Sequence, residues 1–273
     1  MALDINKIKQ RFSTLQNQTK KQDSLWKPPA GKSVIRIVPY KFNKDNPFIE
    51  LLFHYGIGGK SYLSPKTFGR PDPIVEFAEG LKKTGSKDDY KLAKTLEPKL
   101  RTYVPVVVRG EEEAGVKFWG FGKTVYLALL DTISDADYGD ITDPVNGRDV
   151  TVEFKTAEET GKSFPSTTIR VKPTPTPLTT SEHVLKAIAE SQKNILDVYK
   201  ELSYDELKAV LADWLNPKNK EGQAATASAP SDDEEVVQPT KKQSTKSATP
   251  APTVALNMED INKSFDELFE QPK

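Results

Sequence analysis

Polar and hydrophobic residues alternate along several short runs of the chain, and alternation of this kind predicts β-strands that bury one face. The clearest run spans residues 101–121, where the valine-rich segment RTYVPVVV turns at Arg109-Gly110 and returns as VKFWGF. We interpret this run as a β-hairpin. Further strands are predicted at residues 33–39, 47–55, 60–63, 149–155 and 166–172. Short strands joined mostly by hairpins favour a mainly β fold of the small-barrel type.

A helical period replaces this alternation in other parts of the chain. Apolar residues recur three and four positions apart between residues 73 and 96, with a break at Thr84-Gly85-Ser86. We therefore predict a helical insertion between two strands. Ser203 and Glu206 form a capping-box pattern that opens another helix. Helices are also predicted at residues 125–133 and 181–199, and we expect the last two helices to pack back on the body.

The first residues predict a short amphipathic helix. Its apolar residues lie on one stripe, and they are Ile5, Ile8, Phe12 and Leu15. Its cations lie elsewhere on the helix, and they are Lys7, Lys9 and Arg11. A helix of this length is not stable alone. The apolar stripe is therefore expected to dock either on its own domain or on a neighbouring molecule.

The last part of the chain changes character twice. Residues 216–255 contain mainly Ala, Ser, Thr, Pro, Gln and Lys, a composition that predicts a disordered linker. Residues 256–273 regain an acidic amphipathic pattern that is typical of segments folding on a partner. The partner-binding residues predicted there are Ile261, Phe265, Asp266, Glu267, Leu268 and Phe269. The alternative is a tail that only keeps the protein soluble.

Composition adds a charge gradient to this picture. The 273 residues contain 39 basic and 39 acidic side chains, but residues 1–44 hold ten Lys or Arg against two Asp. Residues 221–273 hold five Lys against ten Asp or Glu. A basic front and an acidic tail are typical of nucleic-acid binders. No cysteine is present, which excludes disulfides and thiolate metal sites. No apolar run approaches the roughly 20 residues of a membrane span, and no signal-peptide core is seen, so a soluble, cytoplasmic protein is expected.

The returning strand of the hairpin carries the candidate chemistry. Because alternate residues of a strand share a face, Lys117, Trp119 and Phe121 are expected to point the same way. Flat rings beside a cation suit single-stranded nucleic acid, because any base can stack on an aromatic ring. The alternative is a sheet that is covered on both faces. Arg36 interrupts another apolar strand, so it lies at an edge or faces a ligand.

Enzymatic functions find no support in the sequence. The segment Gly120-Phe-Gly122-Lys123-Thr124 resembles a phosphate loop only superficially, because its spacing is wrong and a strand carries it. The acidic residues between 134 and 148 are interpreted as a solvated loop, with weak ion binding as the alternative. We predict no catalysis and no cofactor. The second hypothesis for function is a protein-interaction scaffold with a β-barrel core.

The order of these motifs resembles the single-stranded DNA-binding, helix-destabilising proteins of T-even type bacteriophages. The motifs that carry the resemblance are SVIRIVPYK, PFIELLFHYGIGGKSYL, RTYVPVVV and VKFWGFGKTVYLALLDTI. The resemblance implies an oligonucleotide-binding (OB) fold that coats single-stranded DNA cooperatively in DNA replication, recombination and repair in an infected host cell. The acidic tail would recruit replication and recombination proteins. The predicted domains are the arm at 1–24, the core at 25–215, the linker at 216–255 and the tip at 256–273.

The resemblance also implies roles for individual residues. Contacts to DNA fall on Arg36, Tyr55, Lys60, Arg101, Tyr103, Trp119 and Lys123, to which the strand alternation adds Lys117 and Phe121. A role in cooperative self-association along DNA falls on Lys7, Lys9, Arg11, Ser13 and Thr14. The family commonly holds a zinc ion with one His and three Cys, and His54 stands where that His would be. Without cysteines we predict no metal, and we expect the helical insertion to replace it by burying Ile74, Phe77, Leu81 and Leu96.

Overall fold

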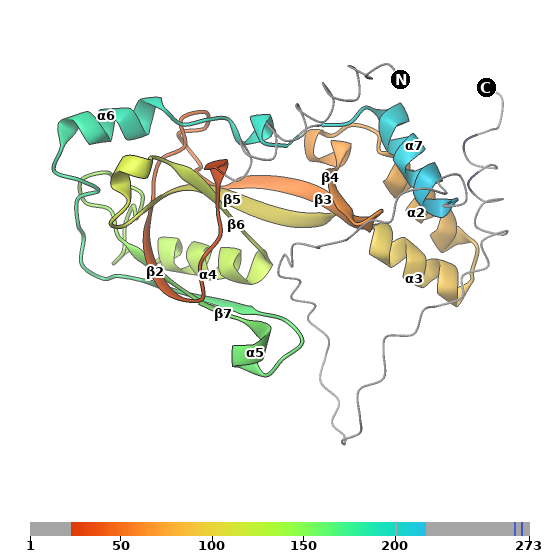
Figure 1. The fold of residues 1–273 in the computed structure, drawn as a ribbon, viewed down its shortest axis with the longest axis horizontal. Coiled ribbons are helices and arrows are strands. Elements are labelled where there is room, and N and C mark those ends of the chain that lie inside the picture. The colour runs from red at the N-terminus through yellow and green to blue at the C-terminus, as the bar shows by residue number, and fades with distance from the viewer. Residues whose placement is uncertain (1–22, 200, 217–264, 266–268, 270–273) are drawn as a thin grey trace, which may run out of the picture. The chain divides into compact units, whose positions relative to one another are not determined.

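The computed structural model describes residues 23–199, 201–216, 265 and 269. These residues belong to two compact units (Figure 1). Of the described residues, unit 1 contains 23–51 and 100–199, and unit 2 contains 52–99, 201–216, 265 and 269. The predicted N-terminal helix, the linker and most of the tip lie outside the described residues.

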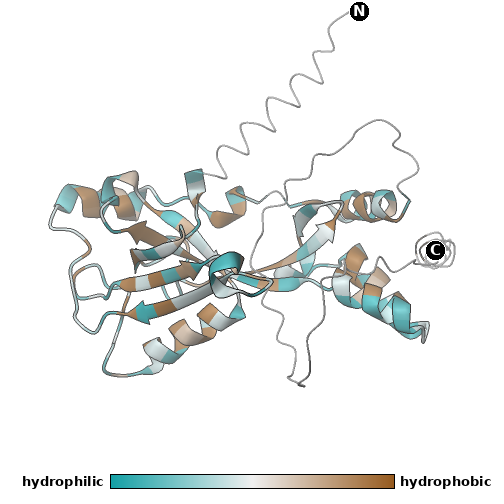
Figure 2. Ribbon diagram, turned by 60° about the horizontal axis from the view of Figure 1, so that its bottom comes forward, coloured by the Kyte–Doolittle hydropathy of each residue, from teal (hydrophilic) through white to brown (hydrophobic). Residues whose placement is uncertain are grey.

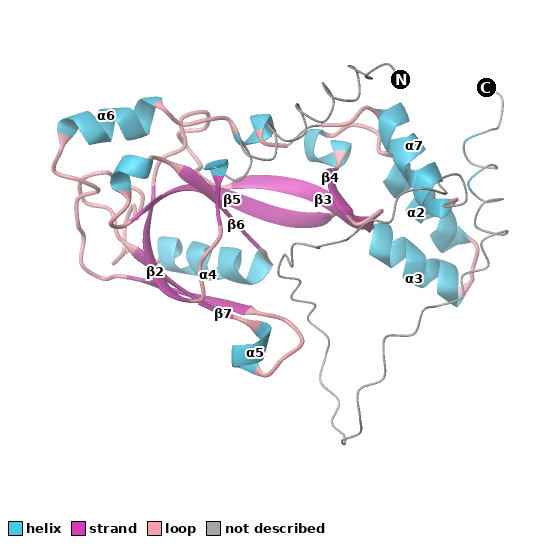
Figure 3. Cartoon of the chain, in the orientation of Figure 1, coloured by secondary structure: helices cyan, strands magenta, loops and turns pink. Residues whose placement is uncertain are grey.

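The strands of unit 1 follow the order β1-β6-β5-β2-β7-β8. Figure 3 draws the strands in magenta and labels β2, β5, β6 and β7 of this unit. The paired strands run antiparallel, except that β1 and β6 are parallel. β1 is a two-residue strand within residues 16–31, where polar residues followed by Pro-Pro-Ala-Gly predict a linker. The strands are β1 (Leu25–Trp26), β2 (Gly31–Ile37), β5 (Lys99–Val108), β6 (Lys117–Phe121), β7 (Val150–Lys155) and β8 (Ser166–Val171).

The main core of unit 1 lies between one face of these strands and helix α4. α4 (Lys123–Ser134) contributes Val125 and Leu129 to this core. A second apolar cluster includes Val38, Leu178 and Ile188, so α6 (Glu182–Glu190) packs on the same unit as predicted. The other helical turns of unit 1 are η2 (Glu112–Ala114), α5 (Ala157–Thr160) and η3 (Ile195–Asp197). The helix predicted at 181–199 is therefore shorter than expected.

In the part of the chain that the structure describes, unit 2 combines a β-hairpin with the helices α2, α3 and α7 and the short turn η1. Its elements are β3 (Ile49–Ile57), whose first three residues belong to unit 1, β4 (Lys60–Leu63), η1 (Pro65–Phe68), α2 (Pro73–Lys83), α3 (Lys87–Leu96) and α7 (Tyr204–Leu215). Asp72 caps α2 and Ser86 caps α3, so the predicted break at 84–86 is confirmed. The capping box of Ser203 and Glu206 is also confirmed.

Helix packing in unit 2 follows the predicted apolar pattern. Helices in the ribbon carry hydrophobic and hydrophilic residues side by side (Figure 2), as helices with one buried face do. The predicted burial of Ile74, Phe77, Leu81 and Leu96 is confirmed, and residues of α7 join them in one core. Strands and helices together agree with the predicted class, a mainly β fold with helices. Among the described helices, none has the length and apolar character needed to cross a membrane.

Candidate nucleic-acid interface

The β5–β6 hairpin is buried on both faces. Trp119 is 1 % exposed, and its neighbours Phe118 and Phe121 are buried as well. The ring of Trp119 packs on Phe121, with centroids 4.6 Å apart, and edge-on against Trp26 at 5.8 Å. The predicted exposure of the Trp119 and Phe121 rings is therefore wrong, because both rings fill the core of unit 1. The alternative interpretation, a sheet that is covered on both faces, is the one that describes this hairpin.

The outer face of the hairpin is covered by segments distant in sequence. Tyr103 lies on this face, and its hydroxyl lies 2.6 Å from that of Tyr199. Its ring occupies the space above Gly120, where an added Cβ would come within 2.5 Å of a ring carbon. Tyr40 packs edge-on against Phe118 with a centroid distance of 5.9 Å. Tyr103 is thus buried too, and the predicted stacking of bases on it has no exposed ring to use.

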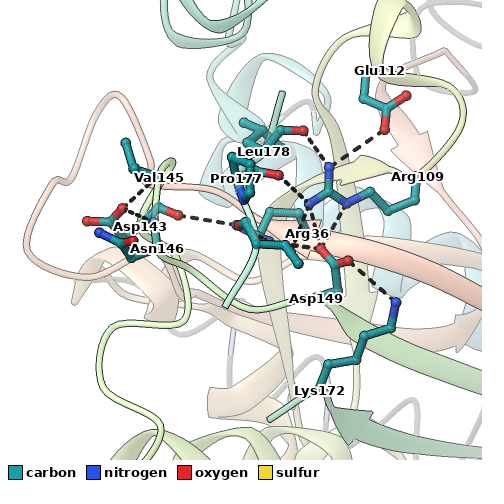
Figure 4. A network of polar contacts seen from close by, with 11 residues as sticks. Arg36, Arg109, Glu112, Asp143, Val145, Asn146, Asp149, Lys172, Pro177 and Leu178 are labelled. Atoms are coloured by element: carbon teal, nitrogen blue, oxygen red, sulfur yellow. Dashed lines mark hydrogen bonds and ion pairs between the residues drawn. The ribbon is translucent and has the colours of Figure 1, made fainter. Parts of the chain in front are cut away.

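Arg36 is fully buried in an ionic network rather than placed at an edge or facing a ligand (Figure 4). Its Nε and Nη2 donate to Asp149 Oδ1 at 3.1 and 2.9 Å. Nη2 also donates to the Thr176 hydroxyl and carbonyl, and Nη1 donates to the Asp143 carbonyl. Arg109 shares the same carboxylate oxygen through its Nε at 2.8 Å. A guanidinium with all three nitrogens engaged inside the protein has a structural role.

The charges of this network compensate one another. Burial alone would raise the pKa of the Asp149 carboxyl, but Arg109 and Arg36 lower it below its ordinary value. Burial lowers the pKa of Arg36, and Asp149 opposes that shift. Lys172 completes the group, with its Nζ 3.5 Å from Asp149 Oδ2. The predicted contact of Arg36 with DNA is therefore replaced by a buried ion pair that ties β2 to the start of β7.

Five other predicted contact residues keep some exposure, and their role with DNA stays a prediction. In unit 1 Arg101 donates to the Gly120 carbonyl at 3.0 Å, and the Nζ of Lys117 lies 3.7 Å from Glu111. Lys123 is exposed at the first residue of α4. In unit 2 Lys60 is exposed and Tyr55 is partly buried on the β3–β4 hairpin.

Most of the predicted functional residues at the two ends of the chain lie outside the described residues. Those of the N-terminal arm, Lys7, Lys9, Arg11, Ser13 and Thr14, lie outside the described residues. So do Ile261, Asp266, Glu267 and Leu268 of the tip. Phe265 and Phe269 are described, and both lie against unit 2.

His54 is the centre of a buried polar cluster in unit 2. Its Nδ1 lies 2.7 Å from the Leu96 carbonyl and its Nε2 lies 2.9 Å from Asp72 Oδ2. Asp72 also accepts from the Ser64 hydroxyl at 2.5 Å and from the first backbone amides of α2. Both ring nitrogens of His54 are therefore occupied, and among the described residues no group of three His, Cys, Asp or Glu could hold a metal ion. The zinc site of the family does not fit here, and this cluster joins β3, α2 and α3 by hydrogen bonds instead.

This cluster predicts an acid-sensitive unit 2. Burial would raise the pKa of Asp72, but hydrogen bonds from His54 and Ser64 lower it overall. A depressed carboxyl pKa contributes stability that is present above the unfolded value near 4 and is lost as pH falls through the folded value. We expect hydrogen exchange of α2 and α3 to report a loss of about 1–3 kcal/mol in this range. The Asp72→Asn variant should show a smaller change with pH, and an equal change in both proteins would contradict the assignment.

An exposed aromatic platform in unit 1 was missed in the sequence, where residues 41–46 are predicted only as a polar loop. Phe42 is 52 % exposed and packs on the buried Tyr40, with centroids 5.4 Å apart. The Lys41 Nζ lies 5.9 Å from the centre of the Phe42 ring, and Lys44 is exposed two residues further on. The only signal in the sequence is one phenylalanine between lysines. An exposed ring with nearby cations is what base stacking and phosphate binding require.

The loop that carries Phe42 is held in place by the segment after α6. The Gln192 side chain accepts from the Lys41 amide and donates to the Pro39 carbonyl, both at 2.9 Å. The Tyr40 hydroxyl lies 3.2 Å from Asn194 Oδ1. These hydrogen bonds fix the backbone next to Phe42, so the loop loses little conformational entropy when a flat ligand binds.

Comparison with known proteins identifies the family of this chain. Residues 29–212 match the family model described as "gp32 DNA binding protein like", which covers more than half of the chain. The chain belongs to this DNA-binding family. The match confirms the resemblance to the T-even phage single-stranded DNA-binding proteins, although the cysteines of the family's zinc site are absent. No curated protein matches the chain. Membership of the family supports binding of single-stranded DNA.

Proposed function

We propose that this protein coats single-stranded DNA cooperatively and without sequence preference, and that it catalyses no reaction. It would act in phage DNA replication, recombination and repair in the cytoplasm of an infected host cell. The family match over residues 29–212 is the observation that carries this proposal. We further infer that unit 1 has the OB fold implied by the resemblance, and its antiparallel strand pairs support that inference.

The proposed contact surface in unit 1 is the loop with Lys41, Phe42 and Lys44. Phe42 offers its ring to a base, and the two lysines offer charge to phosphates on either side. Arg101, Lys117 and Lys123 remain proposed phosphate contacts in this unit, and Tyr55 and Lys60 remain proposed contacts in unit 2. Stacking on a ring and phosphate contacts with lysines do not depend on which base is present. These contacts therefore support binding without sequence preference.

Replacing Phe42 with alanine is expected to weaken binding of oligo-dT by about 1–3 kcal/mol, because a stacked ring is lost. The measurement is a fluorescence titration of the three Trp residues at two or more salt concentrations. Leu127→Ala is the matched control, since Leu127 is also an apolar residue of unit 1 and is 54 % exposed. Unchanged affinity of the Phe42→Ala protein would remove this loop from the site.

The same titration tests the proposed function as a whole. Affinity for single strands should fall with salt, with a log–log slope of about 0.7 per phosphate contact. Duplex DNA should bind more weakly, and equal affinity for the two would refute the proposal. Long strands should give steeper isotherms than short ones, because the arm at 1–24 is proposed to link neighbouring molecules. Identical isotherms would refute cooperative coating.

The acidic C-terminus is proposed to recruit replication and recombination proteins. The residues proposed for this contact are Ile261, Phe265, Asp266, Glu267, Leu268 and Phe269. An acidic segment with regularly spaced aromatic residues suits a partner with an apolar and basic surface.

A further inference from the structure

Phe265 belongs to the hydrophobic core of unit 2, although it follows the end of α7 by 50 positions in the sequence. Its side chain is 8 % exposed. The ring packs edge-on against Phe77 of α2, with centroids 5.8 Å apart. The same core cluster contains residues of α2, α3 and α7, and they include Ile74, Leu92, Leu207 and Leu211. An aromatic residue this deeply buried is typical of a docked segment.

Phe269 extends this contact, because its ring lies 4.9 Å from that of Phe265, centroid to centroid. The Lys208 Nζ of α7 lies 4.8 Å from the centre of the Phe269 ring and donates to the Phe269 carbonyl at 3.3 Å. This lysine therefore satisfies a backbone carbonyl and contacts the face of an aromatic ring at the same time.

We propose that the face formed by α2, α3 and α7 is a binding site for a helical segment with aromatic residues at positions i and i+4, and that the chain's own Phe265 and Phe269 occupy it. Phe265 supplies the buried anchor, and Lys208 fixes the second ring. Because the anchor is apolar, this docking resists salt, unlike a contact made by the acidic side chains of the tip.

The docked state has a consequence that rests on the proposed recruitment of partners. A partner that binds the ring of Phe265 must first remove it from unit 2. A tethered segment meets its site at an effective concentration of up to the order of millimolar. Docking on unit 2 therefore competes with recruitment, because a partner and unit 2 bind the same aromatic residue, Phe265.

A labelled peptide of residues 257–273 tests the docking site directly. The full-length Phe265→Ala protein is expected to bind this peptide at least tenfold more tightly than the wild-type protein, because its own segment no longer fills the site. Fluorescence anisotropy at low and high salt is the measurement. The full-length Leu127→Ala protein is the matched control and should bind the peptide as the wild type does, since Leu127 is an exposed apolar residue of unit 1. A peptide that itself carries Phe265→Ala should bind none of the proteins.

A second variant covers the case in which Phe265→Ala does not fold. Phe269 is only partly buried, so the full-length Phe269→Ala protein should keep its fold and admit the peptide with a smaller gain in affinity. Equal binding to wild type and both variants would overturn the site. Dependence of the gain on protein concentration would place a second copy's segment there and overturn docking within one chain. If the peptide binds as expected but a replication partner does not bind the tip, the proposed recruitment is wrong and the docking site is unaffected.

Discussion

Replacement of Trp119 by alanine is expected to cost about 3–5 kcal/mol in the free energy of unfolding of unit 1, because it removes the largest fully buried side chain among the described residues. The cavity would lie between Trp26 and Phe121, whose rings both contact Trp119. These neighbours belong to paired strands with fixed backbones, so collapse into the space is limited. The affinity of the folded protein for single-stranded DNA should stay close to that of the wild type.

Hydrogen exchange of the β5 and β6 amides measures this loss without relying on the removed fluorophore. Phe42→Ala is the matched control, since it truncates an exposed ring and should change stability by no more than about 0.5 kcal/mol. The two variants should therefore separate stability from binding. If the Trp119→Ala protein kept its stability and lost affinity for DNA, Trp119 would be a contact residue and its assignment to the core would be wrong. Trp119→Phe should restore part of the stability.

The contrast between Trp119 and Phe42 shows what the sequence could not reveal. Alternation along a strand says which residues share a face, but it does not say whether another segment covers that face. The outer face of β5 and β6 is closed by Tyr40 and Tyr199, which come from distant positions. Phe42, an aromatic residue of unit 1 that remains exposed, lies in a loop, where no periodicity marks it. The hairpin itself was predictable, and the location of its exposed rings was not.

Local signals predicted unit 2 more closely. Capping side chains act within a few residues, so the first residues of α2, α3 and α7 are largely set by nearby sequence. The partner of Arg36 is different, because Asp149 lies 113 positions away. Nothing local tells a buried ion pair from a ligand contact. For the same reason, the sequence gives the aromatic pattern of the tip but not the packing of Phe265 on Phe77.

Removal of the Asp149 charge should have an effect as large as that of Trp119→Ala, for an electrostatic reason. Asp149→Asn leaves the guanidinium groups of Arg36 and Arg109 facing each other without the carboxylate they share. Arg36 is 0 % exposed and cannot turn to water. Loss of one partner from a buried ion pair costs about 3–5 kcal/mol. We expect this loss in the free energy of unfolding of unit 1, measured by hydrogen exchange of the β2 and β7 amides.

A double-mutant cycle separates the ion pair from other effects of the substitutions. The Arg36→Met and Asp149→Asn changes together should cost less than the sum of the single changes, because no guanidinium is then left opposite Arg109. Strict additivity would show that the pair is not coupled. In DNA titrations the salt slope of the folded Arg36→Met protein should equal that of the wild type. A slope lower by about 0.7 would instead indicate a lost phosphate contact, and it would return Arg36 to the DNA-binding surface.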